Sequence, residues 1–283
     1  GATDTTVEAP ITGGDLQLTG TDSTTTLGGK VDVENLDVDG KMLAEDVIIA
    51  DNFAVGTNGN LTIDVDCVGS DITNNGTITL TTNGQDEDDP IGRTHIDQLR
   101  HKIDGGNVIV AENLTDDGTH LLDSSDPKTG TLIVADGKTL TITGTELGRD
   151  VTGETGTTYF SNVTSEISIV GTINNELKFA NGAKVRLAEG GNVRFDAPQN
   201  LSTFAMNEGS TLTVKLAMLE GDTGCIVSNL TAVPQIAPGA KLNITDAEGI
   251  VENGIYTLVR GDANVITGNE TLWDLGNITL DPE

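Results

Sequence analysis

Acidic side chains offer the first possible chemistry in this chain of 283 residues. The run Asp86-Glu87-Asp88-Asp89 gathers carboxylates of the kind that Ca²⁺ prefers as ligands. Two pairs, Asp37/Asp39 and Asp64/Asp66, are spaced so that on a β-strand both carboxylates point to one face. The run lacks the spaced ligands and the central glycine of an EF-hand loop. Two hypotheses therefore stand, a calcium site at 86–89 and a solvated acidic loop.

A small group of basic residues stands out against this acidic background: Lys178, Lys184, Arg186 and Arg194. Such a group could bind an acidic sugar. It could also meet the acidic surface of a second copy of the chain, because residues 1–90 hold 18 acidic and 2 basic residues. Charge complementarity of this kind would set the register of an assembly. An ordinary solvated strand face is the alternative.

The sequence contains no recognisable catalytic motif. It has no Gly-x-Ser-x-Gly elbow, no His-Glu-x-x-His pair and no phosphate-binding loop. Of the three histidines, His95 and His101 are six residues apart and would lie on different faces of a helix, and His120 stands alone. We therefore expect a protein that is not an enzyme, with polysaccharide cleavage as the alternative.

Further short patterns are open to more than one interpretation. Cys67 and Cys225 could close a very long loop, or they could be two separate buried thiols. The tripeptide Arg260-Gly261-Asp262 matches a known adhesion signal but is short enough to arise by chance. Nine Asn-x-Ser/Thr sequons are glycosylation candidates, although an Asn turn followed by an apolar-Thr strand creates the same pattern. They are Asn60, Asn75, Asn113, Asn162, Asn200, Asn229, Asn243, Asn269 and Asn277.

The overall charge excludes several partners. Lys and Arg total 15 against 44 Asp and Glu, which gives a formal net charge of -29. A field this negative repels phosphate backbones and anionic lipid surfaces, so we expect no nucleic-acid binding. No apolar run approaches the roughly 18 residues that a spanning helix needs, so we expect no membrane insertion. We also expect no cofactor, apart from calcium at the acidic run.

One local pattern recurs along most of the chain: Gly, a polar residue, then alternating apolar residues. Examples are Gly59-Asn60-Leu61-Thr62-Ile63 and Gly130-Thr131-Leu132-Ile133-Val134. Each predicts a turn followed by a short strand with one buried face. In places, successive predicted strands begin at short and similar intervals along the sequence. Aromatic residues make up only 3% of the chain. These features predict an all-β fold of the β-solenoid or β-helix type, with a β-sandwich or jelly-roll as the alternative.

The pattern also suggests a domain organisation. Residues 1–12 are extended in character and could donate a strand to a neighbouring copy through Val7 and Ile11. Residues 13–283 would form a single elongated β-domain. Within it we expect a loop or helical insertion at 85–104 and loops at 115–129 and 148–158.

The Gly-x-Leu-x-Val units, together with the segments 182–187, 239–244 and 254–259, resemble the passenger regions of bacterial autotransporters and related β-helical surface proteins. The resemblance implies an extracellular or cell-surface protein with a structural or adhesive role. We expect a self-assembling subunit of a filament, sheath or surface layer, or an adhesin stalk. The alternative is a carbohydrate-binding or polysaccharide-degrading protein on the same scaffold. The expected partners are other copies of the chain and glycans.

Overall fold

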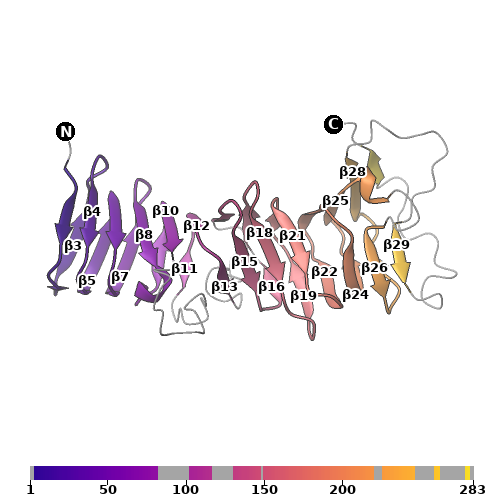
Figure 1. Cartoon of the computed structure of the whole chain (residues 1–283), viewed down its shortest axis with the longest axis horizontal. Helices are drawn as coiled ribbons and strands as arrows, with labels where there is room; N and C mark the ends of the chain where they lie inside the picture. Colours follow the sequence, from indigo (N-terminus) through magenta and orange to yellow (C-terminus); the bar gives the residue numbers. More distant parts are fainter. Residues whose placement is uncertain are drawn as a thin grey trace.

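The computed structural model describes residues 3–81, 102–116, 130–147, 149–219, 225–245, 258–261 and 278–280. The fold is all-β, with 57% strand, and winds into a β-solenoid of about nine turns. Figure 1 shows an elongated rod in which the strands stack side by side along the long axis. Every strand pair in the described ranges is parallel, as successive turns of a solenoid require. The solenoid prediction is therefore confirmed, and the sandwich or jelly-roll alternative is wrong.

A parallel sheet of 13 strands, here called sheet A, runs the length of the rod. Its registered partners mark the length of one turn, as in the pairs Lys41 with Asn60 and Asn192 with Thr211. The strands are β1 (Thr5–Val7), β4 (Thr24–Leu27), β6 (Lys41–Ala44), β8 (Asn60–Asp64), β10 (Thr77–Thr81), β12 (Asn107–Val110), β14 (Thr131–Val134), β17 (Asp150–Thr152), β20 (Thr172–Ile173), β23 (Asn192–Phe195), β25 (Thr211–Lys215), β28 (Lys241–Thr245) and β30 (Ile278–Leu280).

In the N-terminal half the other wall is sheet B. Its strands are β2 (Ile11–Thr12), β3 (Asp15–Leu18), β5 (Val31–Val38), β7 (Ile48–Val55), β9 (Ile72–Asn74) and β11 (Ile103–Asp104). The long strands β5 and β7 are exposed at their middles, where the buried alternation breaks. A ladder of side chains runs along this line: Asn35 Nδ2 donates to Asp15 Oδ1 at 2.5 Å, and Asn52 Nδ2 donates to Asn35 Oδ1 at 2.8 Å. The ladder links three successive turns.

In the C-terminal half two sheets replace sheet B. Sheet C contains β13 (Leu114–Asp116), β15 (Thr139–Ile142), β18 (Thr157–Phe160) and β21 (Glu176–Phe179). Sheet D contains β16 (Glu146–Leu147), β19 (Glu166–Ile169), β22 (Ala183–Leu187), β24 (Gln199–Met206), β26 (Val227–Leu230), β27 (Gln235–Ile236) and β29 (Val259–Gly261). Two short 3-10 helices, η1 (Val65–Cys67) and η3 (Leu216–Leu219), follow β8 and β25. One turn here therefore presents three faces.

The interior is a continuous apolar column built from alternate residues of each strand. Leu61 and Ile63 of β8, for example, are fully buried, whereas Asn60 is exposed. Four phenylalanines form a row of ring contacts inside the C-terminal half, with centroids 5.5, 6.0 and 6.3 Å apart in the order Phe160, Phe179, Phe195 and Phe204. The first contact is stacked, the second is edge-to-face and the third is tilted. These four are among the six aromatic residues of the described ranges, so the large side chains of this half are concentrated in one part of the interior.

The glycine of the repeated pattern occupies a crowded corner before the strands of sheet A. A Cβ atom on Gly130 would lie 2.5 Å from the carbonyl oxygen of Gly106 in the preceding turn, so only glycine fits there. Directly before β17 this corner position is occupied by Arg149 instead of glycine, and Arg149 is only 1% exposed. Its Nη2 donates to the carbonyl oxygen of Ile103 at 3.3 Å. Arg149 thereby contacts the last strand of sheet B close to where sheet D begins.

Several predicted boundaries are wrong. Residues 1–12 do not form a separate donor segment, because Val7 pairs with Leu27 and Ile11 with Val31 of the same chain. The predicted loop at 148–158 contains β17 and the start of β18. Its Asp-Val-Thr strand is so short that the flanking glycines obscured it in the sequence.

The other two predicted interruptions lie partly outside the described residues. The expected insertion at 85–104 is described only from residue 102, where β11 begins one residue later. Thr77 and Asn107 are registered partners across this stretch, so the chain between them is longer than an ordinary turn. The expected loop at 115–129 begins too early, since residues 115 and 116 belong to β13, and 117–129 lie outside the described ranges.

Candidate functional site

The predicted basic group does not form one site. Lys178 lies on β21 in sheet C, Lys184 and Arg186 lie on β22 in sheet D, and Arg194 lies on β23 in sheet A. These three strands are consecutive along one turn and belong to three different sheets. The four cations therefore do not share one face of the rod, although Lys184 and Arg186 lie on the same strand.

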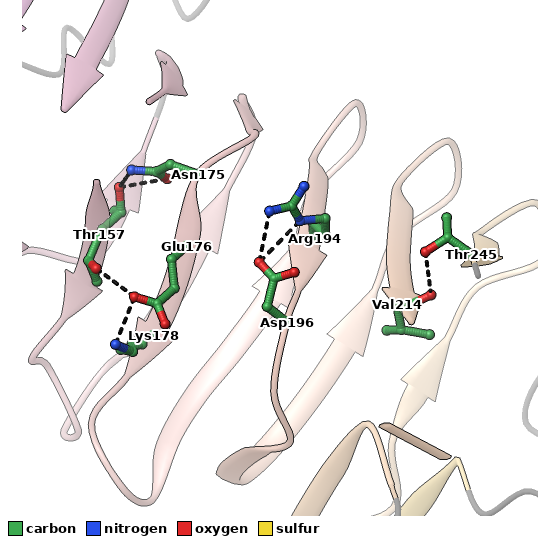
Figure 2. Close-up of polar contacts among 9 residues, drawn as sticks. Thr157, Asn175, Glu176, Lys178, Arg194, Asp196, Val214 and Thr245 are labelled. Carbon is green, nitrogen blue, oxygen red and sulfur yellow. Dashed lines mark hydrogen bonds and ion pairs between the residues drawn. The ribbon is translucent and has the colours of Figure 1, made fainter. Parts of the chain in front are cut away.

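Three of these cations are neutralised by nearby carboxylates. Lys178 pairs with Glu176 at 2.8 Å, and Arg186 pairs with Glu166 at 2.6 Å. Hydrogen bonds from Lys178 and Thr157 lower the pKa of Glu176, while the hydrogen bond to Glu166 raises the pKa of Arg186. Figure 2 shows Glu176 between Lys178 and Thr157, and the third pair joins Arg194 to Asp196. Because these pairs are partly solvent-exposed, they contribute little to stability, and each pair leaves little net charge for a partner.

Arg194 also belongs to a groove of about 500 Å³ on the outer face of sheet A. The groove crosses strands β23, β25 and β28 and touches the residue that follows β20. It is lined by Asn174, Asn192, Val193, Arg194, Thr211, Thr213, Lys241 and Asn243. Two cations, three amides and two hydroxyls thus face one hollow, and none of these lining residues is acidic.

The parallel register arranges these side chains in two rows across the strands. Asn192, Thr211 and Lys241 are registered partners and form one row. Arg194, Thr213 and Asn243 form the second row, two residues further along each strand. Neighbours within a row are one strand spacing apart, about 4.8 Å, and the rows are about 7 Å apart. The result is a regular grid of hydrogen-bonding groups.

A local contact holds Arg194 at the edge of this grid. Its Nε and Nη2 both donate to Asp196 Oδ2, at 3.1 and 3.0 Å, which leaves Nη1 for a ligand (Figure 2). Lys241 is exposed at the start of β28. Sequence reasoning found Arg194 but missed Lys241, because the two are separated by two turns and a longer segment. Counting registered positions from turn to turn is the signal that would have found it.

The predicted carboxylate sites have mixed outcomes. Residues 86–89 lie outside the described ranges, as do all three histidines. Asp64 is buried and the chain turns into η1 directly after it, so Asp64 and Asp66 are not a pair on one strand. Asp37 is exposed on β5, whereas Asp39 lies beyond the end of that strand. Within the described ranges, no three His, Cys, Asp or Glu side chains gather so that they could hold a metal ion.

The cysteines are both buried, Cys67 in η1 and Cys225 just before β26. They follow β8 and β25, which are seven strand steps apart in sheet A. At about 4.8 Å a step this separation is several times the Cα distance that a disulfide spans. The interpretation as two separate buried thiols is therefore correct.

None of the sequon asparagines in the described ranges is buried. Asn60, Asn75, Asn113 and Asn229 are exposed, and Asn162, Asn200 and Asn243 are half-buried. Asn269 and Asn277 lie outside the described residues, and so does Asp262 of the Arg-Gly-Asp tripeptide, whose first two residues belong to β29.

Comparisons with known proteins add no relative. No protein family, characterised protein or solved structure shows a significant match to the chain. In the part of the chain that the structure describes, no helix is long and apolar enough to cross a membrane. The class of the molecule is thus defined by its architecture, a parallel β-solenoid of about nine turns.

Proposed function

We propose that this chain is an extracellular structural protein, acting as a rigid rod in a filament, sheath or surface layer or as the stalk of an adhesin. The observation that carries the proposal is the unbroken sheet A, which joins every turn of the solenoid. A stack of parallel turns with one continuous core resists bending, because each turn pairs with its neighbours along several strands. Resemblance of the repeat to autotransporter passengers supports a cell-surface location.

The N-terminal turn suggests how copies could associate end to end. Val7, Ile11, Leu16 and Leu18 pack against the core but are only partly buried. In β-solenoids such a turn is covered by a further turn, and the turn of a second copy has the matching parallel edge. Stacking of this kind generates a filament when the contact repeats without closing.

Electron microscopy and sedimentation velocity of the purified chain test this proposal across a range of salt and Ca²⁺ concentrations. We expect rods that associate end to end, and we expect Ile11→Lys to reduce association because it places a charge in the contact. The matched control is Thr12→Lys, which adds the same charge at an exposed neighbouring position. Rods that stay monomeric under all conditions would favour the stalk over the filament, and compact globular particles would contradict both.

A further inference from the structure

We propose that the groove on strands β23, β25 and β28 binds an extended acidic oligosaccharide, one that carries carboxylate or sulfate groups along a chain of sugars. The groove differs from the basic group predicted in the sequence, since it shares only Arg194 with it. The inference is independent of the rod's role in assembly, because a monomeric stalk would present the same face.

Charge selects an anionic ligand. Acidic residues outnumber basic ones 44 to 15 in the whole chain, yet the groove is lined by Arg194 and Lys241 and by no carboxylate. Lys241 makes no ion pair with any other residue that the structure describes, and Arg194 keeps Nη1 beyond its pair with Asp196. With Asp196 counted, the net positive charge at the groove is that of Lys241. On a strongly negative protein, this face still repels an anionic group less than a face that carries unpaired carboxylates.

Hydrogen-bonding chemistry selects a sugar chain. Asn192, Thr211 and Thr213 present amides and hydroxyls, which both donate and accept and therefore match sugar hydroxyls. The grid repeats about every 4.8 Å across the strands, close to the length of one sugar unit in an extended glycan. A chain lying across the strands would meet an equivalent pair of side chains at each sugar.

The same face fits other polymers poorly. A protein partner needs apolar or aromatic anchors, but the one apolar lining residue, Val193, is 1% exposed. Strand addition is blocked, because β25 is already paired on both sides by β23 and β28. Single-stranded nucleic acid requires stacking aromatics and a longer basic track, and the groove lining contains no aromatic residue.

Binding is measured by calorimetric titration of the folded chain with galacturonic acid hexamer, and with galactose hexamer as the neutral probe. We expect weak, salt-sensitive binding of the uronate and none of the neutral sugar. Lys241→Gln should weaken binding about five- to tenfold, because it removes a charge-assisted hydrogen bond. Lys41→Gln is the matched control, since Lys41 is exposed at the same position of sheet A in an early turn and flanked by Thr24 and Asn60.

The outcomes separate the explanations. An unchanged Kd for Lys41→Gln together with weaker binding for Lys241→Gln supports the groove. Equal losses in both variants would show unspecific charge attraction and overturn the proposal, as would equal binding of the two sugars or no binding at all. If Lys241→Gln abolished self-association in sedimentation and left uronate binding intact, the groove would be an interface between copies and the proposal would be wrong.

Discussion

A buried polar pair inside the C-terminal half allows the interior packing to be tested directly. Thr158 of β18 and Asn175, which precedes β21, are both 0% exposed. Asn175 Nδ2 donates to Thr158 Oγ1 at 3.0 Å, and Thr158 Oγ1 lies 3.1 Å from Asn175 Oδ1. Figure 2 shows these contacts as dashed lines from the amide of Asn175. The two groups satisfy one another in the buried interior, so their contributions to stability should be coupled.

The perturbation is a double-mutant cycle with Thr158→Val, Asn175→Leu and the double variant. Each single change keeps the approximate volume but leaves the partner's polar group buried without its hydrogen bond, which costs about 1–3 kcal/mol. We expect each single variant to lose about 2 kcal/mol of unfolding free energy. The double variant should lose no more than one single variant, because replacing both partners by apolar groups is close to neutral.

Urea unfolding followed by circular dichroism measures the cycle, with the denaturant slope checked to be the same in all variants. Thr141→Val is the control, since Thr141 lies half-exposed on β15 in the same sheet and should change stability by less than about 0.5 kcal/mol. Additive losses, within about 0.5 kcal/mol, would refute the pairing of these two side chains. A neutral Thr158→Val variant would refute it equally.

Two further predictions concern the corner glycines and the exposed ion pairs. Gly130 and Gly137 both have positive φ, 78° and 70°, but only Gly130 is crowded by the preceding turn. Gly137→Ala should therefore lower the free energy of unfolding, measured with urea, by about 1 kcal/mol. Gly130→Ala should lower it by at least about 1 kcal/mol more, because the added Cβ also meets the preceding turn. Equal losses in the two variants would contradict the close approach of the turns. Lys178 lowers the pKa of Glu176, so its pair contributes stability above the ordinary glutamate pKa and loses it as the pH falls through the lowered value. Carboxyl NMR should show the pKa of Glu176 rise in Lys178→Met, and an unchanged titration would exclude the ion pair.

The strands of this fold were predictable because they follow from local rules. A glycine, a polar residue and alternating apolar residues define a turn and a half-buried strand within one short segment, as in 59–63. The low aromatic content favoured a solenoid with a narrow core over a sandwich with a thick one, and the parallel stacking of the strands confirms the solenoid. Short strands between glycines, such as β17, were missed because so short a segment carries too little periodicity to be recognised.

The candidate site was not predictable to the same degree, because it depends on register rather than on local pattern. Turn length varies, since the step from Thr24 to Lys41 is shorter than the step from Val151 to Ile173, and longer segments enter some turns. A small error in turn length moves a residue to another column, so Lys241 could not be assigned to the row of Asn192 and Thr211. Conversely, the compact basic group of the sequence dispersed over three sheets, since the chain changes direction twice between β21 and β23.

Surface charge in a solenoid must therefore be counted along columns rather than along the chain. The first outward column of sheet A contains a single acidic residue between β4 and β28; its members are Thr24, Lys41, Asn60, Thr77, Asn107, Thr131, Asp150, Thr172, Asn192, Thr211 and Lys241. The exposed face of sheet B instead carries Asp32, Glu34, Asp37 and Asp51 on two adjacent strands. Much of the N-terminal acidity thus lies on a different wall, and sheet A keeps a nearly neutral face of threonine and asparagine. An anionic partner that approaches this rod therefore meets less repulsion along sheet A, the face where Arg194 and Lys241 line the groove, than along sheet B.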